Sequence, residues 1–218
     1  MTIDPETARQ IDELARDDRP LLVLDVDEVV LEFVTPFIAF LNAQGLHLKT
    51  DSFRLHGNIV HVDSSALVED ERVSGLLDDF FEGQDAWQTM ASDAPDVVGR
   101  IAEQAEVVML TAMPHRFRAR RRAFLDRLGF AYPMLTTEAA KGPAIAKLRG
   151  ATPRPVAFVD DIVHNLVSVR DAVPDASLVH LMAHSGLRSL MPPLPEGIIE
   201  AENWRGAEPH LMSALGLR

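Results

Sequence analysis

Two apolar runs of this chain each end in acidic residues: Asp25 and Asp27 after the first, and Asp160 and Asp161 after the second. Carboxylates placed one residue apart repel each other unless a cation or a shared proton lies between them. If the chain stays extended from Asp25 to Asp27, the strand period of two points both side chains the same way. Mg²⁺ prefers such oxygen ligands and is usually held by one or two carboxylates together with a substrate phosphate.

A hydroxyl and an amine complete this set of residues. Thr111 ends a third apolar run, and Lys141 stands where a helix is expected to begin. In phosphoryl transfer one carboxylate can attack phosphorus, while a second protonates the leaving oxygen and later activates water. A hydroxyl and an ammonium can bind the remaining phosphoryl oxygens and offset charge in the transition state. The residue types therefore fit the hydrolysis of a phosphate ester.

Short apolar runs alternate with amphipathic stretches along most of the chain. Alternation of strands with helices of about 10–15 residues predicts an α/β fold, with a mostly parallel sheet covered by helices on both faces. The carboxyl ends of parallel strands lie at one edge, so the acids and Thr111 converge there if their strands are neighbours. The expected strands are 21–24, 107–110, 134–135, 156–159, 178–181 and 197–199.

The regular alternation is interrupted between the first two apolar runs. Residues 34–93 contain a short strand-like piece at 59–62 and an expected helix at 69–81. We therefore predict a core formed by residues 1–33 and 94–218, with a smaller unit of residues 34–93 inserted into it.

Composition and charge limit the classes of partner. A formal net charge of -12 over 218 residues argues against binding to nucleic-acid polymers or anionic membranes, which require a basic field. No apolar run approaches the roughly 20 residues that span a bilayer. The N-terminus lacks the residue order of a signal peptide, so we expect a cytoplasmic protein. The stretch 116–122 contains five of the 21 basic residues, and most such stretches are solvated helix faces.

The motifs, in this order, resemble those of the haloacid dehalogenase-like (HAD) hydrolases, of the small-cap phosphatase type. The resemblance rests on Leu21 to Asp27, Val107 to Thr111, Lys141 and Val156 to Asp161. It implies a three-layer, Rossmann-like parallel sheet core with a small cap between the first and second motifs. Glu28 departs from the pattern, because many members have glycine there. The departure bears on the turn toward the cap rather than on the core chemistry.

The same resemblance implies a role for each acid. Asp25 would be the nucleophile that forms an aspartyl phosphate, and Asp27 would be the acid and base. Mg²⁺ would be held by the Asp25 carboxylate, the Asp27 main-chain carbonyl and Asp161, with Asp160 assisting.

The remaining positions concern the substrate. Thr111, Ala112 and Lys141 would bind phosphate, and Asn165 occupies a further polar position of the fourth motif. The short cap with Trp87 loosely resembles that of 5'-deoxynucleotidase-like members, which favours a nucleotide monophosphate. The expected function is Mg²⁺-dependent hydrolysis of a small phosphomonoester. A phosphomutase, another phosphotransferase of the superfamily, and a non-catalytic HAD-like binding module are alternatives, and the oligomeric state is left open.

Overall fold

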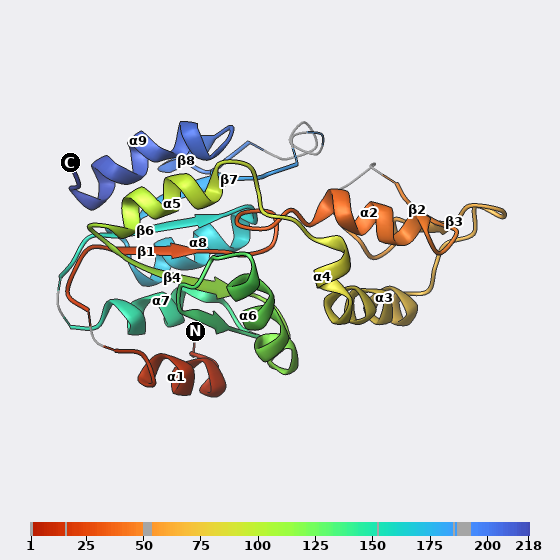
Figure 1. Ribbon diagram of the computed structural model, residues 1–218, viewed down its shortest axis with the longest axis horizontal. Coiled ribbons are helices and arrows are strands. Elements are labelled where there is room, and N and C mark those ends of the chain that lie inside the picture. Colours follow the sequence, from red (N-terminus) through yellow and green to blue (C-terminus); the bar gives the residue numbers. More distant parts are fainter. Residues whose placement is uncertain (1, 16, 50–53, 152, 185, 187–192) are drawn as a thin grey trace.

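Six parallel strands form the centre of the protein. The computed structural model describes residues 2–15, 17–49, 54–151, 153–184, 186 and 193–218. The strands are β1 (Leu21–Leu24), β4 (Glu106–Thr111), β5 (Met134–Thr136), β6 (Val156–Asp160), β7 (Ser177–Leu181) and β8 (Ile198–Ala201). Their order in the sheet is β5-β4-β1-β6-β7-β8, and every neighbouring pair is parallel (Figure 1). The predicted α/β class is confirmed, and the carboxyl ends share one edge.

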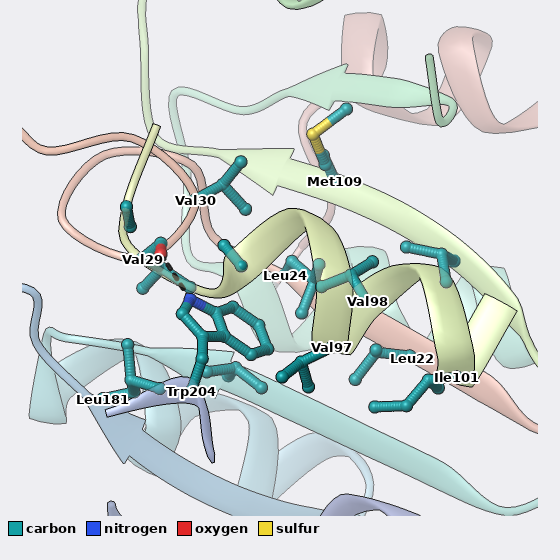
Figure 2. Packing of buried hydrophobic residues seen from close by; sticks show 14 of the residues in the cluster. Leu22, Leu24, Val29, Val30, Val97, Val98, Ile101, Met109, Leu181 and Trp204 are labelled. Carbon is teal, nitrogen blue, oxygen red and sulfur yellow. Dashed lines mark hydrogen bonds between the residues drawn. The ribbon is translucent and has the colours of Figure 1, made fainter. Parts of the chain in front are cut away.

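Helices cover both faces of this sheet: α1 (Pro5–Asp12), α5 (Ala94–Ala102), α6 (Arg118–Arg127), α7 (Lys141–Arg149), α8 (Val163–Ala172) and α9 (Trp204–Leu215). Leu22 and Leu24 of β1 belong to an apolar cluster with residues of α5 and α9, shown around Trp204 in Figure 2. Leu21 and Val23 belong to a second cluster with residues of α7 and α8. Burial on both faces explains the unbroken apolar run in the sequence. None of the described helices has both the length and the apolar character needed to cross a bilayer.

The described part of residues 34–93, the predicted insertion, lies beyond the carboxyl edge of the sheet (Figure 1). It consists of α2 (Val34–Asn42), β2 (Leu46–Leu48), β3 (Ile59–His61), α3 (Asp70–Glu82) and α4 (Gln84–Trp87). β2 and β3 pair in antiparallel fashion. The rings of Phe37 and Phe80 pack edge to face, 5.2 Å between centroids, within an apolar cluster separate from the two in the core. The insertion therefore has a small core of its own.

The basic stretch lies partly against the insertion rather than facing solvent throughout. It begins with a short 3-10 helix, η1 (His115–Phe117), and continues into α6. Arg116 Nη2 lies 2.5 Å from Asp78 Oδ1, and Arg120 Nε lies 3.1 Å from Glu82 Oε2. Arg121 is fully buried. The interpretation of a solvated helix face was therefore wrong for Arg121. The exposed pairs contribute only about 0–1 kcal/mol each.

Gly142 allows α7 to approach α8 closely. A Cβ atom on Gly142 would lie 2.1 Å from the Ser168 main-chain oxygen, and the Gly142 N–H donates to Ser168 Oγ at 3.1 Å. Lys141 is the first residue of α7, so this approach fixes where Lys141 lies at the sheet edge.

We expect Gly142→Ala to lower the free energy of unfolding by about 3 kcal/mol, the upper end of the usual cost of overpacking an interior. Urea unfolding measures the change. Gly99→Ala is a matched control, because a Cβ at Gly99 of α5 meets no atom within 4 Å. Equal midpoints for Gly142→Ala and wild type would contradict the account of this helix contact.

Candidate active site

The chain turns sharply after Asp25. β1 ends one residue earlier, and the Leu31 N–H donates to the Val26 carbonyl at 2.8 Å. The chain therefore does not stay extended through Asp27, which was the condition for both carboxylates to point the same way. The turn is also held by Trp204 of α9, whose Nε1 donates to a main-chain carbonyl of the turn at 2.9 Å (Figure 2). As a result, Asp25 and Asp27 contact different partners.

Lys141 binds two of the predicted acids at once. Its Nζ lies 2.8 Å from Asp25 Oδ1 and 2.6 Å from Asp160 Oδ2. Lys141 and Asp160 are fully buried, and Asp25 is nearly so. Burial alone would lower the pKa of Lys141, but the two carboxylates outweigh it and raise the pKa, so the ammonium stays charged. The neighbouring strands β1 and β6 and the start of α7 thus bring these groups together.

Asp25, Asp160 and Asp161 form a buried acidic cluster. One carboxylate oxygen from each lies within 4.8 Å of the other two. Burial raises the pKa of Asp25 to about 7, against the lowering effect of Lys141 and with a further raise from the charge of Asp160. Burial, followed by the charges of Asp160 and Asp25, raises the pKa of Asp161 well above its usual range. Three oxygen donors this close fit a hard divalent cation such as Mg²⁺.

Asp160 accepts hydrogen bonds from three residues, Lys141, Ile162 and Asn165. Asn165 Nδ2 donates to both carboxylate oxygens at 3.1 Å, and the Ile162 N–H donates to Oδ1 at 2.7 Å. With the contact from Lys141, each oxygen of Asp160 accepts two hydrogen bonds. Asp160 therefore fixes the position of Lys141, and Asn165 fixes the position of Asp160.

A cavity of about 250 Å³ separates the acids from the insertion. Six of the eight predicted site residues line it, and Lys141 and Asp160 lie buried behind them. The lining residues around the acids are Asp25, Asp27, Glu28, Thr111, Ala112, Asp161, Ile162 and Asn165. The other lining residues are Phe33, which directly precedes the predicted insertion, and Val34, Phe37, Leu48, Lys49, Arg54, Leu55 and Phe81 within it. The described wall facing the acids is thus mainly apolar, with two basic residues.

Comparison with known proteins gives matches at the level of structure. No family model matches the sequence, and no curated protein matches it. A candidate phosphatase from Clostridium difficile has a TM-score of 0.59 at 12% identity, over 90% of this chain and 100% of its own. The candidate HAD-hydrolase YfnB from Bacillus subtilis, bound to magnesium, has a TM-score of 0.59 at 13% identity, over 91% and 99%.

A candidate beta-phosphoglucomutase from Thermotoga maritima has a TM-score of 0.56 at 12% identity, over 90% of this chain and 100% of its own. The chain has the HAD-like fold. The predicted resemblance to HAD-like hydrolases is therefore confirmed for the fold, which is what identities of this size establish.

Two contacts within this HAD-like fold were not predicted from the sequence. Asp27 Oδ1 accepts hydrogen bonds from Gln88 Nε2 at 2.8 Å and from Arg121 Nη1 at 2.9 Å. Arg121 precedes the buried Phe124 and Leu125 by three and four residues, so helical spacing could have placed it on the inner face of α6. Gln88 carries no comparable signal, because it lies in an irregular connection from the insertion to the core.

Proposed function

We propose that the protein is a Mg²⁺-dependent phosphatase that hydrolyses small phosphomonoesters through an aspartyl phosphate on Asp25. The observation that supports this most strongly is the buried contact of Asp25 with Lys141, beside Asp161 and at the wall of an open cavity. Similar folds in a candidate phosphatase and a candidate HAD-hydrolase add support. One site therefore contains a nucleophile, carboxylates that can bind a cation, and the ammonium group of Lys141.

In this proposal, two of the acids and a main-chain carbonyl bind Mg²⁺, and Asp160 positions Lys141. Asp25, Asp161 and the main-chain carbonyl of Asp27 would hold Mg²⁺. Asp160 would assist through Lys141, because both of its carboxylate oxygens already accept hydrogen bonds. When bound, Mg²⁺ would offset the negative charge of the buried acids and of the phosphoryl group.

Each step of the reaction falls to a residue of this site. An oxygen of Asp25 attacks phosphorus, and the bond from phosphorus to the leaving oxygen breaks. Asp27 gives a proton to that oxygen and then takes one from a water molecule whose oxygen attacks phosphorus. The bond from phosphorus to the Asp25 oxygen breaks, which releases phosphate and the free Asp25 carboxylate. Thr111 and Ala112, which line the cavity, would bind the phosphoryl oxygens. Lys141, in contact with Asp25, would offset charge in the transition state.

The insertion would act as the predicted cap and contact the leaving group. Phe33, Phe37 and Phe81 line the wall opposite the acids, and aromatic rings offer surfaces on which a flat group such as a nucleobase can pack. A nucleotide monophosphate therefore remains our preferred substrate. A mutase substrate would bring sugar hydroxyls to the same wall, and each buried hydroxyl without a hydrogen bond costs about 1–3 kcal/mol. The apolar wall therefore favours a leaving group with an aromatic ring over a hexose, the sugar of a phosphoglucomutase substrate.

Phosphate release from a panel of phosphomonoesters, with and without EDTA, tests this proposal. We expect EDTA to lower the rate by about 100-fold or more, since metal ions supply several kcal/mol of charge stabilisation. Added Mg²⁺ should restore the rate, and nucleotide monophosphates should react faster than hexose phosphates. Isomerisation of a hexose phosphate without phosphate release would favour the mutase. No reaction on the whole panel would favour the binding module.

A further inference from the structure

Glu28 has a main-chain conformation that usually belongs to glycine. Its φ is 67°, in the left-handed region, and its side chain is almost fully buried. A side chain at this φ is strained, because the Cβ comes too close to the following carbonyl. Strain of this kind persists only where surrounding contacts hold it in place.

The Glu28 carboxylate accepts three main-chain hydrogen bonds from two segments, one five and six residues ahead of it and the other 156 residues away. Oε2 accepts from the N–H groups of Phe33 at 3.0 Å and Val34 at 2.7 Å. Oε1 accepts from the N–H of His184 at 2.5 Å. The Glu28 main-chain carbonyl also accepts from the Ala183 N–H at 2.9 Å. Glu28 therefore joins the segment after Asp27 to the loop after β7.

One of these segments is the start of the insertion. Phe33 is the N-cap of α2, and its own side chain caps no N–H group of the helix. The first N–H groups of a helix need acceptors from elsewhere, and a carboxylate is favoured there by the helix dipole. Glu28 supplies that carboxylate from the core side of the connection.

Two further contacts join the same parts of the molecule. Thr35 Oγ1 of α2 and His184 Nδ1 lie 3.1 Å apart. Val34 of α2 and Met182, just after β7, form a small apolar cluster of their own. The start of the insertion therefore lies against the loop after β7 through polar and apolar contacts, with Glu28 between them.

We propose that Glu28 is a positioning residue that fixes the direction in which the insertion leaves the core. The consequence for catalysis rests on the proposed function: Glu28 sets how the apolar wall of the cavity faces Asp25. Phe33 and Val34, whose N–H groups Glu28 binds, are themselves part of that wall. Loss of the carboxylate should therefore move the wall and leave the acidic cluster in place.

Glu28→Gly tests this role, since glycine relieves the strain but removes all three side-chain hydrogen bonds. We expect amide hydrogen exchange at Val34 and His184 to speed up by about tenfold or more, because hydrogen bonds to charged acceptors carry at least that factor. Glu28→Gln keeps the size and one acceptor oxygen, so its increase should be smaller. Glu32→Gln, in the same connection, is the control and should leave both amides unchanged.

Kinetics separates positioning of the wall from a general loss of structure. For an aryl phosphate, kcat/KM of Glu28→Gly should fall by about 10- to 100-fold, because a shift near 1 Å can cost that much. For acetyl phosphate, whose small leaving group does not reach the wall, the change should stay within about threefold. An equal fall in kcat/KM for the two substrates, or unchanged amide hydrogen exchange at Val34 and His184, would overturn the proposal. If the wild type hydrolyses neither substrate, the proposed function fails and exchange alone decides the role of Glu28.

Discussion

We expect Asp25→Asn to lower the rate of phosphate release by about 10⁴-fold or more, as loss of an enzyme nucleophile does. The amide cannot attack phosphorus, so no aspartyl phosphate forms. The fold should survive, because asparagine has nearly the same size and Lys141 keeps its contact with Asp160. Phosphate release and the urea unfolding midpoint, measured on the same preparation, check both parts.

Asp63→Asn is a matched control for this experiment. Asp63 is an exposed acid of the insertion, so its substitution changes the net charge by the same amount away from the site. We expect it to retain the wild-type rate. If Asp25→Asn released phosphate at the same rate as Asp63→Asn, Asp25 would not be the nucleophile.

Lys141→Met should have the largest effect on stability. It leaves the carboxylates of Asp25 and Asp160 buried without their cation, and an unpaired buried charge costs about 3–5 kcal/mol. We expect the free energy of unfolding at pH 8 in EDTA to fall by about this amount. Urea unfolding followed by circular dichroism measures it.

The pH dependence of this loss has a defined sign. Burial raises the pKa of Asp25 to about 7 even though Lys141 lowers it, so removing Lys141 should raise that pKa further. A carboxyl group whose pKa is raised in the folded state binds its proton more tightly there than in the unfolded state. The free energy of unfolding therefore falls as the pH rises toward the pKa of that group in the folded state. The deficit of Lys141→Met should therefore shrink between pH 8 and pH 6.

Lys147→Met is the control for the loss of a lysine in the same helix. Lys147 Nζ lies 2.7 Å from Asp12 Oδ1 at the surface of the protein, and exposed pairs are worth about 0–1 kcal/mol. We expect this variant to stay within about 0.5 kcal/mol of wild type. Equal losses for Lys147→Met and Lys141→Met would contradict the account of a buried, cation-dependent cluster.

The strands and their polar ends could be predicted because that signal is local. Each apolar run is contiguous, and parallel pairing of β1 with β4 and β6 brings Asp25, Thr111 and Asp160 to one edge. The partners of Asp27 could not be predicted in the same way. Arg121 and Gln88 are 94 and 61 residues away in sequence, so only the packing of α6 and the insertion against the core brings them together.

Glu28 lies between these two cases. The sequence shows an acid where the resembling proteins often have glycine, and this correctly directs attention to the turn toward the insertion. It does not show that the carboxylate binds main-chain N–H groups, because such donors are present in every residue except proline. Only the path of the chain places the N–H groups of Val34 and His184 around it.

A crystal structure grown with Mg²⁺ and beryllium fluoride, a mimic of the phosphoryl group, tests the central claim most directly. We expect beryllium bonded to a carboxylate oxygen of Asp25, and one Mg²⁺ bound by both Asp25 and Asp161. Beryllium fluoride at another residue, or an Mg²⁺ that Asp25 and Asp161 do not share, would contradict the account.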